Sequence, residues 1–243
     1  MSSSLNILCI DSSTEACSVA LSTNNKTILQ RFMLAPREHT QKILPTIDEV
    51  IKEAQLTLSD VDVIAYGQGP GSFTGVRIGI SIAQGLAFGL DKKMVGISTL
   101  QAMAQQVYVE TKLNDQICNS VYAAIDARMG EVYFAHYINI NGVMQLQGEE
   151  KVITPEALIE FQQKDGISNI KESMLVGTGW SAYPELLDFY KEGVVSDILY
   201  PNAMYMLEAA ALLINKDAAV APEQAIPVYL RDTVTWKKLP GRE

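Results

Sequence analysis

The sequence predicts an α/β protein made of two similar subdomains, each with a mixed β-sheet and flanking helices. Short β-rich runs first follow one another and then alternate with helical patterns, and this order occurs twice along the chain. The pair Ile10-Asp11 at the end of the first run recurs as Ile125-Asp126 in the second half. A chain of 243 residues is long enough to bury a core in each half. We place the subdomains at residues 1–107 and 108–243 and leave open whether the tail packs back on the first.

The first half begins with three β-rich runs that are separated by turn-forming Asp, Ser and Asn residues. The predicted strands lie at residues 5–10, 16–21 and 27–33, with turns at 11–14 and 24–25. An amphipathic helical pattern follows, with Thr40 as the expected N-cap and Pro45 as either a kink or a first-turn residue. Its apolar face carries Ile43, Leu44, Ile47, Val50, Ile51 and Ala54.

A buried strand at residues 61–66 leads into a glycine-rich loop at 67–75 and a helix that runs to about residue 90. A strand at 94–97 and a helix at 99–107 complete the first half. The second half repeats the opening strands and ends in an irregular tail from residue 227. Its predicted strands lie at residues 121–125, 131–137, 143–146 and 174–176, and its helices begin near 155 and span 203–214.

The chain is acidic, because 19 Lys and Arg residues stand against 28 Asp and Glu residues and give a net charge of −9. This balance argues against unaided binding of nucleic acid or an anionic membrane, since both begin with neutralisation of phosphates by cations. The most apolar uncharged stretch, residues 78–90, is shorter than the ~20 residues that a membrane-spanning helix needs. No secretory signal is visible, and Cys9, Cys17 and Cys118 form neither a CxxC pair nor a metal-binding spacing. We therefore expect a cytoplasmic protein with free thiols and no membrane contact.

The glycine-rich loop is the most informative segment, because it joins a buried strand to a helix, where backbone N–H groups can receive an anion. No Lys-Ser or Lys-Thr pair follows it, so it is not a P-loop, and its glycine spacing does not fit a dinucleotide fingerprint. Gly69, Gly71 and Ser72 are weak candidates for contact with a cofactor. Close packing is the preferred interpretation, because Gly71, Gly75 and Gly79 recur every four residues and let another backbone approach, within the chain or from a partner.

Asp11 and Asp126 each follow a predicted strand and begin a turn. Each could hold Mg²⁺ or a catalytic water, or could cap its own turn, and capping is preferred because no further carboxylate stands close by in sequence. Duplicated three-stranded units with an aspartate in the first turn are typical of the actin-like, sugar-kinase-like (ASKHA) ATPase fold. In that fold the two aspartate turns face one cleft between the subdomains.

Conventional catalytic sets do not occur in the sequence. There is no GxSxG elbow, and the two histidines lack a metal-ligand spacing. His39 stands at the predicted start of a helix and is expected to be a capping or surface group. His136 alternates with aromatic residues along a strand and is expected to be structural.

Several segments closely resemble the TsaB (YeaZ) family, and the likeness spans essentially the whole chain. The most specific segment is residues 66–79, and the others are residues 10–21, 36–40, 124–133, 177–180, 227–231 and 236–241. The resemblance implies a non-catalytic subunit of the bacterial complex that adds threonylcarbamoyl to adenosine 37 of tRNAs (t6A). It implies direct docking on the paralogue TsaD, which performs the transfer, with TsaE joining that pair and TsaC acting in the pathway. It further implies that tRNA is reached only through the complex and that the isolated chain forms a homodimer.

The resemblance also assigns residues. The metal-binding histidine pair of TsaD falls on Thr99 and Met103, and its later aspartate falls near Asn202, so no metal site and no catalytic residue is implied. No tightly bound cofactor is implied either, and a nucleotide at the partner interface stays open. Docking is expected through the helices at about 39–54 and 74–90. The interface residues implied are His39, Ile43, Leu44, Ile47, Val50, Ile51, Phe73, Gly75, Val76 and Gly79.

Two other functions stay open. One is an active ATPase, phosphotransferase or metallopeptidase-like enzyme of the same fold, and the missing histidine pair counts against it. The other is a stand-alone RNA-binding module, which the net charge and the lack of an aromatic and basic platform disfavour. The tail is the one locally basic segment, and solvation is its preferred interpretation. Its basic residues are Arg231, Lys237, Lys238 and Arg242.

Overall fold

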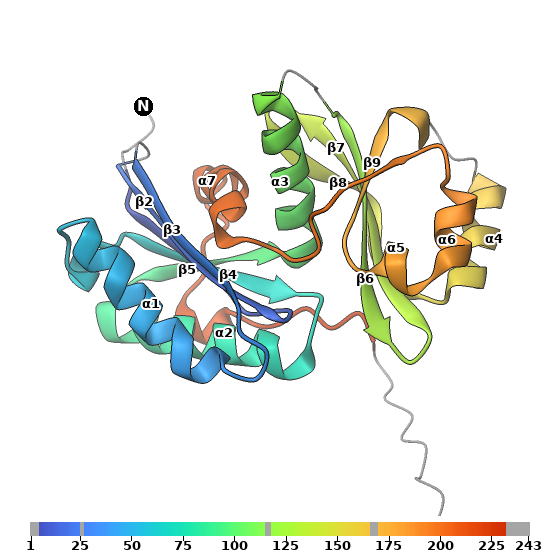
Figure 1. Cartoon of the computed structure of the whole chain (residues 1–243). Helices are drawn as coiled ribbons and strands as arrows, with labels where there is room; N and C mark the ends of the chain where they lie inside the picture. The colour runs from blue at the N-terminus through green and yellow to red at the C-terminus, as the bar shows by residue number, and fades with distance from the viewer. Residues whose placement is uncertain (1–4, 25–26, 115–117, 166–169, 232–243) are drawn as a thin grey trace, which may run out of the picture.

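The computed structural model describes residues 5–24, 27–114, 118–165 and 170–231 (Figure 1). It contains two five-stranded sheets, with the strand order β3-β2-β1-β4-β5 in the first and β10-β9-β6-β7-β8 in the second. Read from its other edge, the second sheet has the order β8-β7-β6-β9-β10, so both sheets share one connectivity. The predicted duplication is therefore confirmed.

Each sheet consists of an antiparallel meander that is extended by parallel strands. The central strand β1 pairs antiparallel with β2 and parallel with β4, and β6 pairs in the same way with β7 and β9. This repeated mixed sheet is the actin-like, sugar-kinase-like fold that the sequence predicts. The strands are β1 Ile7–Asp11, β2 Ala16–Thr23, β3 Thr27–Leu34, β4 Val63–Gly69, β5 Lys93–Ser98, β6 Ser120–Arg128, β7 Glu131–Ile140, β8 Val143–Ile153, β9 Ser173–Val176 and β10 Val194–Val195.

Figure 1 shows α1 and α2 on the outer face of the first sheet, α4 and α6 on the outer side of the second, and α3 and α7 between the sheets. Helix α3 packs against β6, β7 and β8, so the predicted subdomain boundary after residue 107 falls inside a helix that belongs with the second sheet. The α-helices are α1 His39–Glu53, α2 Phe73–Leu90, α3 Thr99–Leu113, α4 Pro155–Asp165, α5 Gly179–Ala182, α6 Pro184–Phe189 and α7 Leu207–Asn215. Short 3-10 helices span Leu58–Asp60, Ile170–Glu172, Ala203–Met206 and Pro222–Gln224.

The alternation of side chains along β1 divides the first subdomain into two cores. Leu8 and Ile10 pack in the core under α1 and α2, whereas Ile7 and Cys9 pack in the core that α7 covers. The first sheet is thus buried on both faces. Helix α7, which follows the second sheet in the sequence, helps to cover the second of these faces.

The chain returns to the first subdomain after α7. Val220 and Met94 exchange two backbone hydrogen bonds of 2.8 Å, which fixes the returning segment beside β5. The Gln84 side chain on α2 donates to the carbonyl oxygens of Pro222 at 3.0 Å and Ala225 at 2.9 Å. The segment that follows α7 therefore packs on the first subdomain, and residues 232–243 lie outside the described residues.

Helix α1 begins earlier than the sequence predicts. Its first residue is His39, and Glu38 occupies the N-cap position without a side-chain capping bond, so the prediction of Thr40 as N-cap is wrong. The His39 side chain instead connects the helix start to β2, because its Nε2 atom lies 3.1 Å from the Ala16 carbonyl oxygen. Pro45 lies inside the helix.

Helix α2 is long and apolar enough, by length and composition, to cross a membrane. Its apolar side chains have another role here, because Val76, Ile80, Ala83 and Ala87 are buried in the core of the first subdomain. Ser72 caps its start by accepting a hydrogen bond of 3.3 Å from the Gly75 N–H group. We therefore treat α2 as a core helix of the folded chain.

Candidate functional site

The first aspartate turn lies at the end of β1, and its carboxylate is enclosed by the protein. Asp11 is 1% exposed, and its Oδ1 accepts hydrogen bonds of 3.0 Å from both the backbone N–H group and the hydroxyl of Ser13. The Ser13 hydroxyl in turn accepts a 3.0 Å hydrogen bond from Thr99. Burial raises the pKa of Asp11 to about 6. A Cβ atom at Gly67 would lie 1.9 Å from Oδ2, so the absence of a side chain there makes room for this carboxylate.

Glycines at the end of the glycine-rich loop and in the first half of α2 pack against that same turn. A Cβ atom at Gly71 would lie 2.2 Å from the Ser13 carbonyl oxygen, and one at Gly75 would lie 2.2 Å from the Ser12 carbonyl oxygen. A Cβ atom at Gly79 would lie 2.7 Å from Ser12 Oγ. Close packing at these glycines is therefore confirmed, and their neighbour is a turn of the same chain rather than a partner helix.

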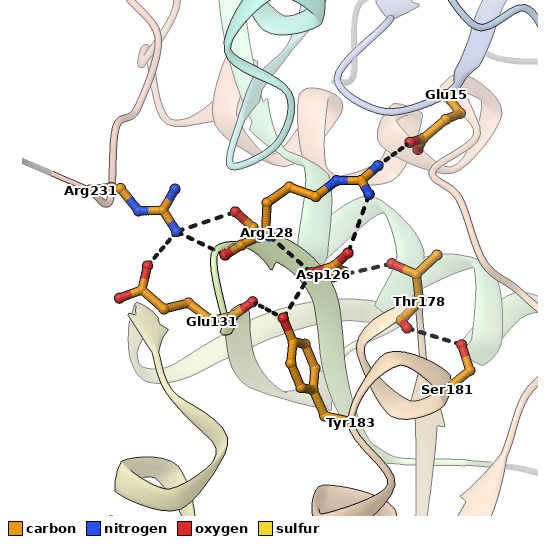
Figure 2. A network of polar contacts seen from close by, with 9 residues as sticks. Glu15, Asp126, Arg128, Glu131, Thr178, Ser181, Tyr183 and Arg231 are labelled. Atoms are coloured by element: carbon orange, nitrogen blue, oxygen red, sulfur yellow. Dashed lines mark hydrogen bonds and ion pairs between the residues drawn. The ribbon is translucent and has the colours of Figure 1, made fainter. Parts of the chain in front are cut away.

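The second aspartate turn joins β6 to β7, and Figure 2 shows its polar contacts. Asp126 Oδ1 accepts hydrogen bonds from the Arg128 N–H group at 2.9 Å and from the Tyr183 hydroxyl at 3.0 Å. The Asp126 N–H group donates to Thr178 Oγ1 at 3.1 Å. Both Asp11 and Asp126 thus bond the N–H group two residues further on, as the turn-capping interpretation predicts.

Two arginines connect the second turn to the rest of the chain (Figure 2). Arg128 reaches across to Glu15 in the first subdomain with an N–O distance of 3.1 Å. Arg231 forms an ion pair with Glu131 and donates to the carbonyl oxygens of Ala127 at 3.2 Å and Arg128 at 3.3 Å. The prediction that Arg231 belongs to a solvated tail is therefore wrong, while Lys237, Lys238 and Arg242 lie outside the described residues.

The histidines have structural contacts. His39 is 7% exposed and its Nε2 lies 3.1 Å from the Ala16 carbonyl oxygen, so the expectation of a capping or surface group is wrong. Its ring is buried because it joins the first turn of α1 to β2. His136 stacks on Tyr122 with a centroid distance of 4.2 Å and bonds Ser120 at 2.9 Å. Burial lowers the pKa of His136, and its role is structural as predicted.

The residues on which the resemblance places the metal ligands of TsaD have packing or capping contacts in the structure. Thr99 bonds Ser13, and Met103 is buried in the core between α3 and the second sheet. Asn202 caps the 3-10 helix that begins at Ala203, accepting a 3.0 Å bond from the Met204 N–H group. Among residues 5–24, 27–114, 118–165 and 170–231, no group of three or more His, Cys, Asp or Glu side chains is placed to hold a metal.

The structure divides the implied interface residues between the core and the surface. Ile43, Ile47, Val50, Ile51 and Val76 are at most 5% exposed and belong to the core of the first subdomain, and their implied contact with a partner stays a prediction. These side chains of α1 are buried because they pack in the core against the first sheet. Leu44 and Phe73 do lie on the surface, 50% and 60% exposed, and Phe88 is 80% exposed.

Sequence reasoning missed two features of the site. One is a buried polar cluster between the subdomains, in which the Ser98 and Tyr137 hydroxyls both donate to Glu150 and burial raises the pKa of that carboxyl. No local signal announces it, because its three residues come from β5, β7 and β8. The other is the crossing of the tail, where the Val228 N–H group donates to the Gln68 carbonyl oxygen at 2.8 Å and the Tyr229 ring lies tilted against that of Phe73.

The fold and the site define a chain of the ASKHA fold in which each of the two turn aspartates accepts a hydrogen bond from the N–H group two residues further on. The model of the family described as TsaD, tRNA N6-adenosine threonylcarbamoyltransferase, matches residues 24–238. A Clostridium botulinum protein of that name is 24% identical over 84% of this chain and 61% of its own length.

Other relatives are more similar. The tRNA threonylcarbamoyladenosine biosynthesis protein TsaB of Escherichia coli is 47% identical over 98% of this chain and 100% of its own length. The protein of the same name from Haemophilus influenzae is 45% identical over 98% of this chain and 99% of its own length. The solved structure of YeaZ from Pseudomonas aeruginosa has a TM-score of 0.79 at 38% identity and covers 93% of this chain and 100% of its own. The chain therefore belongs to the TsaB (YeaZ) family.

Proposed function

We propose that this chain is a non-catalytic subunit of the cytoplasmic machinery that makes threonylcarbamoyladenosine in tRNA, and that it docks on and activates the TsaD paralogue. The names of its relatives support the pathway. The single observation that carries the docking role is the outer surface of α2, where Phe88 is 80% exposed and a Cβ atom at Gly85 or Gly89 would meet nothing within 4 Å. The TsaE ATPase joins the pair, TsaC acts earlier in the pathway, and tRNA is reached through the complex.

The first aspartate turn supports the absence of chemistry. Asp11 is 1% exposed, is hydrogen-bonded by Ser13 and lies against Gly67, so its carboxylate is enclosed by the protein and already has partners from within the chain. Thr99 and Met103 offer no imidazole at the positions of the TsaD ligands. The chain thus has the architecture of the fold, and the residues around its first aspartate turn pack and hydrogen-bond with one another.

The outer surface of α1 and α2 supports docking. Leu44 on α1 and Phe88 on α2 are large apolar side chains that are half or more exposed. A Cβ atom at Gly85 or Gly89 would meet nothing within 4 Å, so a partner backbone can approach α2 closely there. These residues form what we call the α1–α2 docking face: Leu44, Phe73, Ser81, Gly85, Phe88 and Gly89. In the absence of the paralogue, the same face would pair with a second copy and give a homodimer.

The structure changes which variants test this interface. A bulky side chain at Gly75 would strike the Ser12 carbonyl oxygen and damage the fold, so loss of binding in such a variant would be uninformative about docking. Leu44→Glu places a charge on the docking face without entering the core. Leu113→Glu is its matched control, because Leu113 is 78% exposed at the end of α3.

The test is co-purification of tagged wild-type and variant chains with the TsaD protein of the same organism. We expect wild type and Leu113→Glu to retain the transferase and Leu44→Glu to lose it, because a carboxylate would be desolvated in an apolar contact. No retention by wild type, or equal retention by all three chains, would contradict the proposal. An active ATPase of the same fold remains the second candidate, and ATP·Mg²⁺ binding that Asp11→Ala abolishes would favour it.

A further inference from the structure

One exposed arginine on α2 differs from the other arginines that the structure pairs with carboxylates. Arg31 contacts Glu49 and Glu53, Arg128 contacts Glu15, and Arg231 contacts Glu131. The side chains of Arg77 and Arg37 form no ion pair or hydrogen bond within the described part of the chain, although the protein carries an excess of acidic residues. Of these two, Arg77 lies against aromatic rings. An exposed guanidinium in a chain with a net charge of −9 therefore has no carboxylate assigned to it.

Aromatic rings hold this guanidinium in place. The Arg77 Cζ atom lies 3.3 Å from the centroid of the Phe73 ring and 5.2 Å from that of Tyr229. The two ring centroids are 5.8 Å apart, so the three side chains form one cluster, which we call the Arg77 stack. Phe73 is one helical turn before Arg77 on α2, and Tyr229 comes from the returning tail.

The returning tail fixes the position of Tyr229. The Val228 N–H group donates to the Gln68 carbonyl oxygen at 2.8 Å, and Arg231 bonds the β6–β7 turn two residues further on. The backbone of Tyr229 is therefore held between two anchored residues, Val228 and Arg231, while Tyr229 itself stays 44% exposed. The cluster is organised before any partner arrives, which reduces the side-chain entropy lost on binding.

Stacking determines which part of Arg77 remains available. The rings cover a flat face of the guanidinium, whereas its N–H groups point outward from the edge of the plane. Those N–H groups are arranged to donate two parallel hydrogen bonds to one carboxylate. Arginine and large aromatic side chains are also the residue types that dominate the energy of protein interfaces.

We infer that the Arg77 stack is the charged anchor of the docking face and receives a carboxylate side chain, Asp or Glu, from the paralogous partner. The inference rests on the proposed docking role, because Phe73 belongs both to the stack and to that face. A protein carboxylate is favoured over the phosphates of RNA by the acidic charge of this chain, which repels a polyanion. It is also favoured because the Phe73 ring already lies against the guanidinium and is not a free platform for a base.

The test is the dissociation constant between the full chain and the TsaD protein of the same organism, measured by biolayer interferometry at low and high salt. Arg77→Gln should weaken binding about tenfold or more at low salt, since a hydrogen-bonded ion pair is lost at an interface. The loss should shrink at high salt, and Arg77→Lys should fall between wild type and Arg77→Gln because it keeps the charge without the planar fork. Arg31→Gln is the matched control and should bind like wild type, because its charge is already paired with Glu49 and Glu53.

The outcomes separate this inference from the docking proposal. If Leu44→Glu abolishes binding while Arg77→Gln stays within twofold of wild type, docking stands and the anchor is overturned. If wild type does not bind the transferase at all, the docking proposal fails and the anchor with it. If Arg77→Gln weakens only the retention of tRNA by the assembled complex, or only self-association of this chain, the carboxylate assignment is overturned in favour of that occupant.

Discussion

Alanine at Gly75 and alanine at Gly85 should change the stability of the fold in opposite directions, although both glycines lie on α2. A Cβ atom at Gly75 would lie 2.2 Å from the carbonyl oxygen of Ser12, which is far below any ordinary contact. That oxygen belongs to the backbone of the turn that Asp11 caps, so it cannot swing aside as the end of a flexible side chain would. A Cβ atom at Gly85 meets nothing within 4 Å.

The expected sizes follow from these two environments. Overpacking a site without room costs ~1–3 kcal/mol, whereas alanine in place of an exposed glycine inside a helix stabilises by ~0.5–1 kcal/mol. In a chain of this size 1 kcal/mol corresponds to ~2–4 °C in Tm. We therefore expect Gly75→Ala to lower Tm by ~2–12 °C and Gly85→Ala to raise it by ~1–4 °C.

Thermal unfolding followed by circular dichroism measures both variants beside wild type. Two protein concentrations are needed, because self-association through the docking face would make Tm depend on concentration. A Tm for Gly75→Ala that equals or exceeds that of wild type would refute the packing of the glycine stripe on the Ser12 turn. A clear loss in Gly85→Ala at the lower concentration would refute the free face of α2.

Three further outcomes follow from buried and paired groups. The raised pKa of Asp11 means that the folded state binds this proton more tightly than the unfolded state, so the free energy of unfolding of wild type falls as pH rises from about 4 to above 6. Over that pH range the free energy of unfolding of Asp11→Asn, measured by urea titration, should rise by ~2–3 kcal/mol relative to that of wild type. Parallel pH curves for the two proteins would contradict this. The Tyr190 hydroxyl is buried without a hydrogen-bond partner in the described residues. Tyr190→Phe should therefore leave the free energy of unfolding unchanged or raise it by ~1 kcal/mol. A decrease of more than that size in urea titration would mean that the hydroxyl does form a hydrogen bond. Arg231→Gln removes a largely buried ion pair and should lower the free energy of unfolding by ~1–3 kcal/mol. Arg128→Gln removes an exposed ion pair and should lower it by less than ~1 kcal/mol. Equal losses in urea titration would count against an anchored tail.

The sequence was sufficient for the architecture because its signals are local. The Asp11 turn, the strands around it and the glycine-rich loop each follow from neighbouring residues, and the recurrence at Asp126 predicts the second sheet. The preferred role of both aspartates as turn caps was also readable, because Asp bonds the N–H group two residues on wherever a turn allows it.

The division of α1 and α2 between core and surface was not readable. Gly71 and Gly75 have the same spacing as Gly85 and Gly89, yet the first pair packs on the Ser12–Ser13 turn and the second is open. The two pairs differ only because the β1–β2 turn passes over the start of α2 and not over its end. That path belongs to the tertiary structure and has no signal in the local sequence. Leu44 likewise sits beside Ile43 at the edge of one apolar stripe, and the width of the sheet decides that only Ile43 is buried.

Contacts between distant segments explain the remaining misses. Ser98, Tyr137 and Glu150 meet because α3 leads from one sheet to the other and β7 and β8 return to the same place. Tyr229 reaches Phe73 only because the tail crosses back over the glycine-rich loop. Neither meeting has a periodicity or a motif from which it could be predicted.

The central claim is that this chain assists its paralogue without performing chemistry. Its most direct test is the rate of threonylcarbamoyladenosine formation in tRNA by purified TsaC, TsaD and TsaE, with and without this chain. The account predicts no product from this chain without TsaD, little product without this chain, and full activity when wild type or Leu113→Glu is added but not Leu44→Glu. Full activity in its absence, or product formed by this chain in place of TsaD, would contradict the claim.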